Sequence, residues 1–556
     1  MEEKELFNTL DKTAKLMDDK KGETYPSRKI ENRKKIFKKI FAGWVKDNYD
    51  KIFLIILGLA FIIRMVVFFK TLNQPLWFDA AHYLSPAKRL ALDLPINDIW
   101  YYRRGFLWAL IPLIIFKFGL GEAGVRFAEV LFSTGIVFVS YFLIKEMFNK
   151  KLALASSIGL TFSWIILFFT GRPLTSIPAT FFLLLGLLFF WKGYVKKNGD
   201  FYIYLFAIFY TLSILTRMQY VMFAPVFLIF IFTKEKFKFL KDKRLWFAFV
   251  IFLLIFTPQV ILYSSHYGNP VMDWVSYYAG IEGTSKTGEV GDRPSVFDSS
   301  NFDYFFDLPY MLTTPIFVLF IIGVFYFFID LILGFDSIFK NQDNQKKLFV
   351  FLWIFIPFFA LGYITPYIEQ RYIIPILPFL FVISAIALFQ ISNFIKNYFK
   401  LKEKHILTIS FIVLIALLIP NLTWANNLID AKKNSYLEVK QSGLWIKENS
   451  NHEDIIISKS KPQLQYYSER SVYPIALARY AKHTQTKELL KYQEGEAGLD
   501  SFIKDYKPRY LMLSVYENHE PWMYSYPQRH NETLIPVQTF GNPKQPSVVI
   551  YEFKFD

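Results

Sequence analysis

Apolar runs long enough to cross a lipid bilayer recur along this chain of 556 residues, and they limit its possible folds more than any other feature. A hydrocarbon core of roughly 30 Å takes about 20 apolar residues in a helix, which bonds its own backbone polar groups. With 53% hydrophobic and 19% aromatic residues, the composition excludes an ordinary soluble globular protein. We therefore predict an α-helical polytopic membrane protein with eleven spans, at 52–69, 124–144, 152–170, 175–191, 201–216, 218–233, 245–264, 309–334, 347–364, 372–390 and 405–423.

The apolar run at 105–119 decides how these spans are oriented. It is short and contains Pro112, so it has the length of a re-entrant or interfacial segment. If it does not cross, every strongly basic loop lies on the side of the basic N-terminus, as the positive-inside rule requires; if it crosses, all of them lie outside. We therefore predict a multi-pass protein of the cell membrane, with its N-terminus in the cytoplasm and its C-terminus outside. These basic loops are KEMFNKK, WKGYVKKN, KEKFKFLKDKR, KNQDNQKK and KNYFKLKEKH.

Three regions follow from this arrangement. Residues 1–50 form a cytoplasmic basic segment, which lies on the inner leaflet as an amphipathic helix or extends as a solvated tail. Residues 51–423 form the transmembrane domain, with a large first external loop at 71–123. Residues 424–556 alternate helix and strand patterns, among them KPRYLMLSVY and SVVIYEF, and predict a small external α/β domain.

Charge and cysteine content narrow the possible partners. The net charge of +16 does not indicate nucleic acid, because Lys and Arg cluster in the short loops between spans. The absence of cysteine excludes disulfides and thiolate metal sites.

The first external loop carries a carboxylate soon after the first span, in WFDAAHYLSPAKRLALDLP (77–95). The Ser-Pro pair at 85–86 predicts the start of a surface helix, on which Lys88 and Arg89 face water. Asp79 precedes that helix at headgroup depth, where it can take the proton from an acceptor hydroxyl. The alternative is that its side chain only caps a turn.

Two arginines in or beside spans also draw attention. Arg371, in YIEQRYIIPILPFL, opens a late span from the outer side. It can bind a phosphate bidentately and stabilise a leaving group, or it can serve only as an interfacial anchor. Arg64 lies within the first span, where we expect it to face the bundle interior and pair with a carboxylate.

Taken together, these stretches resemble the polytopic GT-C glycosyltransferases similar to protein O-mannosyltransferases and bacterial aminoarabinose transferases. The resemblance covers roughly residues 50 to 480 and rests on the order of several segments. Those segments are WFDAAHYLSPAKRLALDLP, GEAGVRFAEVLFSTGIVFVSYFLIKEMF, LTSIPATFFLLLGLLFFW, QRYIIPILPFLFVISA and, in the external domain, SGLWIKEN and DIIISKSKPQLQYYSERSVYP.

The resemblance implies that a hexosyl or pentosyl group moves, with inversion, from a polyprenyl- or dolichyl-phosphate donor to an acceptor hydroxyl on the outer face. Asp79 falls on the family's catalytic acid and is the expected general base. The side chains expected to bind the donor phosphate are Arg104, Arg371 and Arg172. The side chains expected to position the substrates are His82, Tyr83, Glu369 and Tyr372.

Two positions depart from the family pattern. Ala80 follows the acid where many members have Glu, and Ser176 stands where a second Asp is usual. The second departure keeps open an alternative function, a catalytically inactive protein or a transport or assembly subunit for lipid-linked sugars. An oligosaccharyltransferase is a further alternative, but the Trp-Trp-Asp signature of that family is absent from the external domain.

The expected partners are the lipid-phosphate sugar donor, a glycan, lipid or protein acceptor, and the bilayer, without nucleic acid. We expect no cofactor and no metal, because arginines can stabilise a monophosphate without an ion and His82 alone is a poor ligand. A carboxylate of the 265–308 loop, such as Asp273 or Glu282, would have to complete any metal site.

The orientation can be tested with reporter fusions. Fusions after residues 197, 240 and 400 should report the cytoplasm, and fusions after 290 and 556 the outside, because the basic loops are retained inside. The reverse pattern would mean that 105–119 crosses the membrane.

Overall fold

The computed structural model describes residues 47–97, 104–267, 302–333, 341–364, 368–484, 486–518 and 520–555. The chain forms two compact units, 1–54 and 55–556, and the contacts discussed below lie within the second. Nearly all of the predicted segment 1–50 and most of the 265–308 loop, including Asp273 and Glu282, lie outside the described residues.

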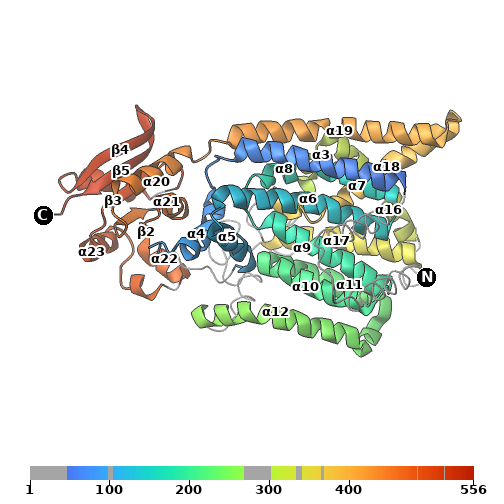
Figure 1. Cartoon of the computed structure of the whole chain (residues 1–556), viewed down its shortest axis with the longest axis horizontal. Coiled ribbons are helices and arrows are strands. Elements are labelled where there is room, and N and C mark those ends of the chain that lie inside the picture. Colours follow the sequence, from blue (N-terminus) through green and yellow to red (C-terminus); the bar gives the residue numbers. More distant parts are fainter. Residues whose placement is uncertain are drawn as a thin grey trace, which may run out of the picture. The chain divides into compact units, whose positions relative to one another are not determined.

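Helices occupy all of the predicted spans (Figure 1). The membrane part contains α3 (Asn48–Thr71), α4 (Phe78–Leu92), α5 (Leu107–Lys117), α6 (Gly121–Met147), α7 (Lys150–Phe162), α8 (Trp164–Thr170), α9 (Ser176–Phe190), the π-helix η1 (Trp191–Val195), α10 (Asp200–Thr216), the 3-10 helix η2 (Met218–Phe223), α11 (Ala224–Glu235), the 3-10 helix η3 (Lys236–Lys241), α12 (Lys243–Tyr267), α14 (Asp303–Phe306), α15 (Leu308–Leu312), α16 (Thr314–Leu333), α17 (Gln342–Ile364), the 3-10 helix η6 (Gln370–Ile373), α18 (Leu377–Tyr398) and α19 (Glu403–Lys432). Among the described helices, seven are long and apolar enough to cross a membrane, or eight if the bent pair α7–α8 is one span. The predicted polytopic helical fold is confirmed, and the number of spans stays a prediction.

The short helix α5 covers the run whose role decides the predicted orientation. Its 11 residues extend about 16 Å, roughly half the thickness of a hydrocarbon core. It packs against α4 at the end of the bundle that lies nearest the C-terminal strands (Figure 1). This length and place agree with a segment that does not cross the membrane.

A bend separates α7 from α8 at Ser163, where the two helix axes differ by 51°. The side chain of Asn421, from α19, stabilises the break. Its Oδ1 accepts a hydrogen bond from the Trp164 backbone N–H at 3.3 Å, and its Nδ2 donates to the Leu312 carbonyl and the Thr313 hydroxyl at 3.0 and 2.8 Å. The break brings α8, and the loop that follows it, to the same end of the bundle as α4.

Arg64 faces the interior of the bundle, as predicted, but the prediction that it pairs with a carboxylate is wrong. Its guanidinium donates to the Ser133 hydroxyl at 2.7 Å and to the carbonyls of Leu160 and Ala60 at 3.2 and 3.1 Å. In the part of the chain that the structure describes, it pairs with no carboxylate. Three neutral acceptors thus satisfy this buried cation, and they tie α3 to α6 and α7.

A second buried arginine, Arg126 of α6, joins the loops at the α4 end of the bundle. It pairs with Glu122 one turn earlier at 2.6 Å and donates to the carbonyls of Gly171 and Gln74 at 2.6 and 2.5 Å. Gln74 precedes α4 and Gly171 follows α8. Arg126 therefore holds these two connections against α6.

The C-terminal region is a small α/β domain. Its elements are α20 (Leu437–Asn449), β1 (Ile455–Ser458), α21 (Lys461–Ser468), β2 (Ser471–Tyr473), α22 (Leu477–Thr484), the 3-10 helix η7 (Lys487–Leu489), α23 (Glu496–Tyr506), β3 (Tyr510–Ser514), α24 (Pro521–Arg529), β4 (Leu534–Asn542) and β5 (Gln545–Phe553). The sheet order is β2-β1-β3-β5-β4, with parallel pairing around β1 and antiparallel pairing around β5. The predicted α/β character is confirmed, and β2 and β4 add two strands that were not predicted.

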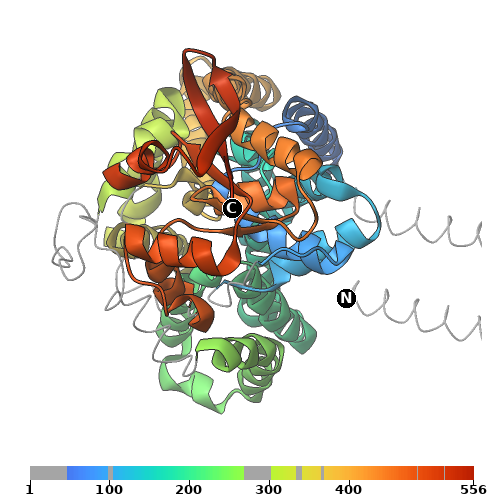
Figure 2. The same ribbon diagram turned by 90° about the vertical axis from the view of Figure 1, so that its left-hand side faces the viewer.

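This domain packs directly on α4 and on the segment that precedes it. Helix α21 lies against α4, and Figure 2 shows the blue segment beside the orange C-terminal helices. The Tyr467 hydroxyl accepts a hydrogen bond from the Leu76 backbone N–H at 2.7 Å, and Gln465 donates to the Ser85 hydroxyl at 3.2 Å. The Leu76 contact lies three residues before Asp79, and Lys440 donates to the Asn73 carbonyl further upstream, so the domain fixes the start of α4.

Lys88 corrects the prediction that its side chain faces water. It forms an ion pair with Glu469 at 2.8 Å and donates to the Tyr466 carbonyl at 3.0 Å, with 14% of its side chain exposed. Periodicity alone placed Lys88 on the polar face of α4, but that face is covered by α21. Arg89, next to it, is exposed as predicted.

Lys88→Ala should therefore loosen the C-terminal domain. We expect a double-mutant cycle with Glu469→Ala, measured by thermal unfolding in detergent, to give a coupling free energy of about 0.5–3 kcal/mol. Lys447→Ala is the matched control: Lys447 pairs with the same Glu469 at 2.7 Å but lies within the domain and is 43% exposed. Equal sensitivity of the domain to limited proteolysis in both single variants would contradict the role of Lys88.

Candidate functional site

Asp79 lies in the first turn of α4, which begins at Phe78 and not, as predicted, at the Ser-Pro pair. Pro86 is instead inside the helix, where it removes one backbone hydrogen bond without ending it. The earlier start matters, because the N-terminus of a helix favours a carboxylate. It also fixes the Asp79 backbone in regular structure, whereas the sequence placed this residue in a loop.

Two arginines converge on the Asp79 carboxylate, Arg104 from the connection after α4 and Arg371 from 292 residues away. Arg371 Nη2 donates to Oδ2 at 2.9 Å, and Arg104 Nη2 lies 3.9 Å from Oδ1. The Asp79 side chain is 36% exposed, whereas Arg371 is 10% exposed. Burial raises the pKa of Asp79, but the charges of Arg104 and Arg371 outweigh it and hold the pKa below its usual value.

Glu369 provides a second carboxylate beside Arg371. Its Oε2 lies 3.2 Å from Arg371 Nε, at ion-pair distance but without the angle of a hydrogen bond. Its backbone N–H donates to the Tyr304 hydroxyl at 3.1 Å, which anchors the segment before η6. Arg371 thus pairs with two acids, Asp79 of α4 and Glu369 of its own segment.

Arg104 is positioned by neighbours from α10 and α12. Gln259 accepts a hydrogen bond from the Phe106 N–H at 3.1 Å and donates to the Arg104 carbonyl at 3.3 Å. Gly105 lies so close to α10 that a Cβ would meet the Leu215 carbonyl oxygen at 1.9 Å, so only glycine fits there. The Arg104 guanidinium also stacks over the Tyr83 ring, 4.8 Å from its centre.

The other predicted positioning residues lie around this pair. The rings of His82 and Tyr83 contact edge to face at 6.5 Å. Tyr372 follows Arg371, whose guanidinium lies 5.6 Å from its ring centre. The structure therefore brings together seven of the eight predicted site residues around one point.

Arg172 is the exception. Its guanidinium is packed between the rings of Trp77 and Phe168, at 4.4 and 3.6 Å, and donates to the Phe168 carbonyl. Burial lowers its pKa well below the usual value, and the nearby charge of Arg126 lowers it further. Within the described residues, its Nε and Nη2 have no hydrogen-bond partner. Arg172 supports the approach to α4 and does not contact Asp79 in this arrangement.

Arg217 is a site residue that the sequence prediction missed. It donates to the hydroxyls of Thr175 and Ser176 at 2.8 and 3.1 Å and to Gln219 at 2.6 Å. Its guanidinium lies 4.5 Å from the centre of the Tyr372 ring. At the position where the family pattern has a second acid, this chain therefore has a hydroxyl bonded to an arginine. The sequence did contain a signal for this residue. Arg217 is the single residue between two predicted spans, and the predicted topology places it on the side opposite the basic loops.

The cluster formed by Arg104, Arg217, Arg371, Asp79 and Glu369 contains three guanidinium groups and two carboxylates. Arg104 and Arg371 lie against Asp79, Arg371 also lies against Glu369, and the partners of Arg217 are neutral. Among the described residues, no three His, Asp or Glu side chains gather closely enough to hold a metal ion. Such a site suits an anion with planar, bidentate acceptors, such as a phosphate.

The fold and this site define a class, a polytopic membrane protein with an arginine–carboxylate site beside an α/β domain. Residues 105–262 match the family model described as dolichyl-phosphate-mannose-protein mannosyltransferase. ArnT from Cupriavidus metallidurans bound to undecaprenyl phosphate superposes with a TM-score of 0.60 at 13% identity, covering 90% of this chain and 97% of that one. The oligosaccharyltransferase of Archaeoglobus fulgidus, tethered to an acceptor peptide, gives 0.57 at 12% identity, covering 85% and 70%.

The chain therefore has the GT-C fold of the polytopic glycosyltransferases, and the resemblance predicted from its sequence is confirmed. No curated protein sequence matches the chain significantly.

Asp79→Asn should lower the thermal unfolding midpoint by a few degrees at pH 7, because Arg371 and Arg104 lose the charge between them. A carboxyl group with a depressed folded-state pKa stabilises fully above its unfolded pKa, and this contribution is lost as the pH falls through the folded value. The difference between wild type and variant should thus stay constant from pH 7 to about 5 and shrink below about 4. Asp93→Asn, at the exposed end of the same helix, is the control. A more stable Asp79→Asn variant at pH 7 would contradict the pairing.

Proposed function

We propose that the protein is a membrane glycosyltransferase that moves a sugar from a polyprenyl- or dolichyl-phosphate donor to an acceptor hydroxyl. The observation that carries this proposal is the Asp79 carboxylate held between Arg371 and Arg104 at one end of a GT-C bundle. Asp79 supplies the base, and the arginines supply the binding site for the leaving phosphate.

The kind of donor follows from charge and from the proteins with the same fold. ArnT is bound to undecaprenyl phosphate, and the A. fulgidus enzyme AglB was solved with a dolichol-phosphate. A lipid monophosphate carries little enough charge for two or three arginines to neutralise. Arg104 and Arg371 beside Asp79, with Arg217 beside the Tyr372 ring, match that need.

In the proposed reaction, the acceptor oxygen forms a bond to the anomeric carbon while the bond from that carbon to the phosphate oxygen breaks. Asp79 takes the acceptor's proton, and the phosphate keeps the electron pair, stabilised by Arg104 and Arg371. Attack opposite the leaving group inverts the anomeric centre. Because Arg371 is bonded to Asp79 before substrates enter, donor phosphate must compete for this guanidinium and thereby frees the carboxylate to act.

The remaining residues take supporting roles. Glu369 orients Arg371, while Tyr83 stacks on Arg104 and His82 lies beside Tyr83 at the acceptor side. Tyr372 stacks on Arg217, which extends the positive surface toward Ser176. Under the predicted topology, this whole site opens on the outer face of the membrane.

Asp79→Asn should cut turnover of a synthetic polyprenyl-phosphate sugar by about 10²-fold or more while donor binding persists, because the amide cannot accept the proton. Arg371→Ala should instead weaken donor binding as well as transfer. Asp93→Asn should transfer at the wild-type rate. Normal turnover by Asp79→Asn would rule out Asp79 as the base. If Arg371→Ala loses donor binding but the wild type shows no measurable transfer, the transport or assembly role is favoured.

Transfer should not require a divalent metal, since arginines can neutralise the charge of a monophosphate. The measurement is turnover after dialysis against EDTA, with EDTA retained in the assay. Loss of activity restored by Mg²⁺ or Mn²⁺ would show a metal site and point to a carboxylate of the 265–308 loop.

A further inference from the structure

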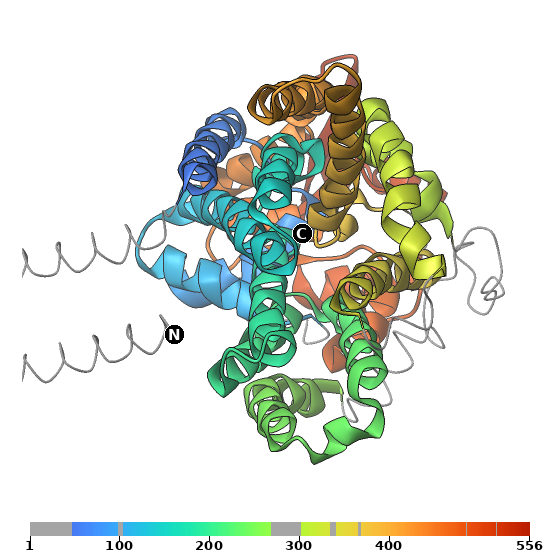
Figure 3. The same cartoon turned by 90° about the vertical axis from the view of Figure 1, so that its right-hand side faces the viewer.

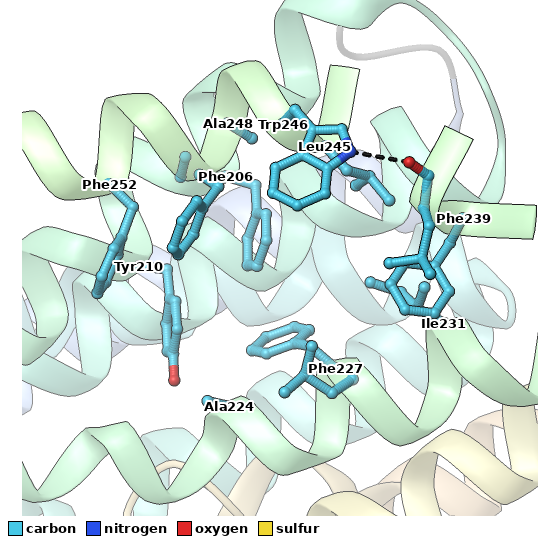
Figure 4. A pocket seen from close by; sticks show the side chains of 14 residues that line it. Phe206, Tyr210, Ala224, Phe227, Ile231, Phe239, Leu245, Trp246, Ala248 and Phe252 are labelled. Atoms are coloured by element: carbon cyan, nitrogen blue, oxygen red, sulfur yellow. Dashed lines mark hydrogen bonds between the residues drawn. The ribbon is translucent and has the colours of Figure 1, made fainter. Parts of the chain in front are cut away.

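An apolar groove lies between α10, α11 and α12, with a volume of about 470 Å³ (Figure 4). Its walls include Phe206, Tyr210, Phe227, Leu228, Trp246 and Phe252. The only hydroxyl among all the residues that line it belongs to Tyr210 and already donates to the Tyr220 carbonyl at 3.2 Å. The groove therefore offers apolar contact and no polar recognition along its length.

The groove is distinct from the Asp79 site. The α12 residues that line it lie between Leu245 and Phe252, in the first half of the helix, whereas Gln259, which contacts Arg104, lies in the second half. Helix α12 lies on the margin of the bundle (Figures 1 and 3), and only 11% of the residues in its most apolar stretch are buried. The first half of α12 packs on α10, where Ala248 clusters with Ile203 and Ala207, so the space left to fill lies between α12 and α11.

A basic turn forms one end of the groove. Phe239 and Leu240 of η3 line the groove, and lysines surround them in the sequence KFKFLKDK. Four lysines are exposed and form no ion pair within the described residues, namely Lys236, Lys238, Lys241 and Lys243. Arg244, in contrast, is neutralised by Asp242 and Asp200 at 2.7 and 3.1 Å. This end of the groove, which we call its mouth, therefore has unpaired lysines directly beside an apolar wall.

The side chains around this mouth have the character of a membrane interface. Phe237 and Leu240 are 71% and 48% exposed, and they alternate with the exposed lysines. Trp246 is 53% exposed, and its indole N–H donates to the Leu240 carbonyl at 2.8 Å (Figure 4, dashed line). Tryptophan and lysine together mark headgroup depth, where the amphipathic ring lies at the interface and the ammonium reaches the phosphates.

We propose that this groove binds an anionic phospholipid, with an acyl chain between α10, α11 and α12 and the headgroup phosphate against Lys236, Lys238, Lys241 and Lys243. Charge complementarity selects this occupant, since basic pockets between membrane helices attract anionic headgroups. The sugar donor is a poorer fit, because its phosphate belongs at the opposite end of α12, beside Arg104. With the predicted topology, the lipid comes from the inner leaflet.

Such a lipid would also steady the active site. By packing between α11 and the first half of α12, it supports the position of α12, and Gln259 of that helix holds the Arg104 segment. Anionic lipid therefore supports the placement of Arg104 without contacting it.

The test is native mass spectrometry of the full-length protein titrated with phosphatidylglycerol or phosphatidylcholine that carry the same acyl chains. We expect selective retention of phosphatidylglycerol. Lys238→Gln with Lys241→Gln should weaken it by about tenfold or more, at roughly 1 kcal/mol per lysine. The control Lys400→Gln with Lys402→Gln removes the same charge from another exposed turn and should change nothing.

A second pair of variants tests the apolar part. Leu228→Trp places a larger ring in the groove and should reduce retention, whereas Ile229→Trp, exposed beside it on α11 but outside the lining, should not. Equal retention of both lipids, or equal behaviour of the variants and their controls, would overturn the proposal. Displacement of phosphatidylglycerol by an equimolar polyprenyl monophosphate would overturn it too, because the groove would then belong to the donor. Since all readouts are binding, they stand apart from the success or failure of the transferase assay.

Discussion

The ion pair between Asp79 and Arg371 joins two segments 292 residues apart, and the arrangement of the site depends on it. Asp79 is held by α4 and Arg371 by η6, while Arg104 is held by Gln259 of α12 and by the close packing of Gly105 on α10. A carboxylate between two guanidinium groups remains ionised, so the resting site stores a base and a phosphate-binding group in mutual contact. Substrate binding can exchange the partner of Arg371 without any change of fold.

Much of this could be predicted from sequence. Asp79 and Arg371 were predicted because each is a charged residue near the end of a long apolar run. A charge at the membrane interface indicates a functional or an anchoring role. Their proximity was expected from the predicted topology, which places both segments on the same face of the membrane. The α/β character of the tail followed from alternating apolar residues in strands such as Tyr510–Ser514.

The errors have a common physical origin. Lys88 was expected in water because helical periodicity shows only which face is polar, and an ion pair with Glu469 satisfies such a face equally well. Arg64 was expected to find a carboxylate, but a hydroxyl and two carbonyls suffice. Arg217 was missed because its partners, Thr175, Ser176 and Gln219, are neutral and carry no charge pattern. Tertiary contacts decided all three cases.

Two elements outside the site support it from opposite sides. The C-terminal domain holds the start of α4 through Tyr467 and Gln465, and α12 holds Arg104 through Gln259. The domain therefore positions the base, and the marginal helix positions a phosphate ligand. This division explains why the C-terminal domain and an exposed helix can both matter to one small cluster of side chains.

The most direct test of the central claim is a cryo-electron microscopy structure of the full-length protein with a polyprenyl-phosphate sugar. We predict that the phosphate lies within hydrogen-bond distance of Arg371 and Arg104, with the anomeric carbon facing Asp79 and the Asp79–Arg371 contact broken or lengthened. A phosphate bound elsewhere, with the Asp79–Arg371 pair unchanged, would contradict the account.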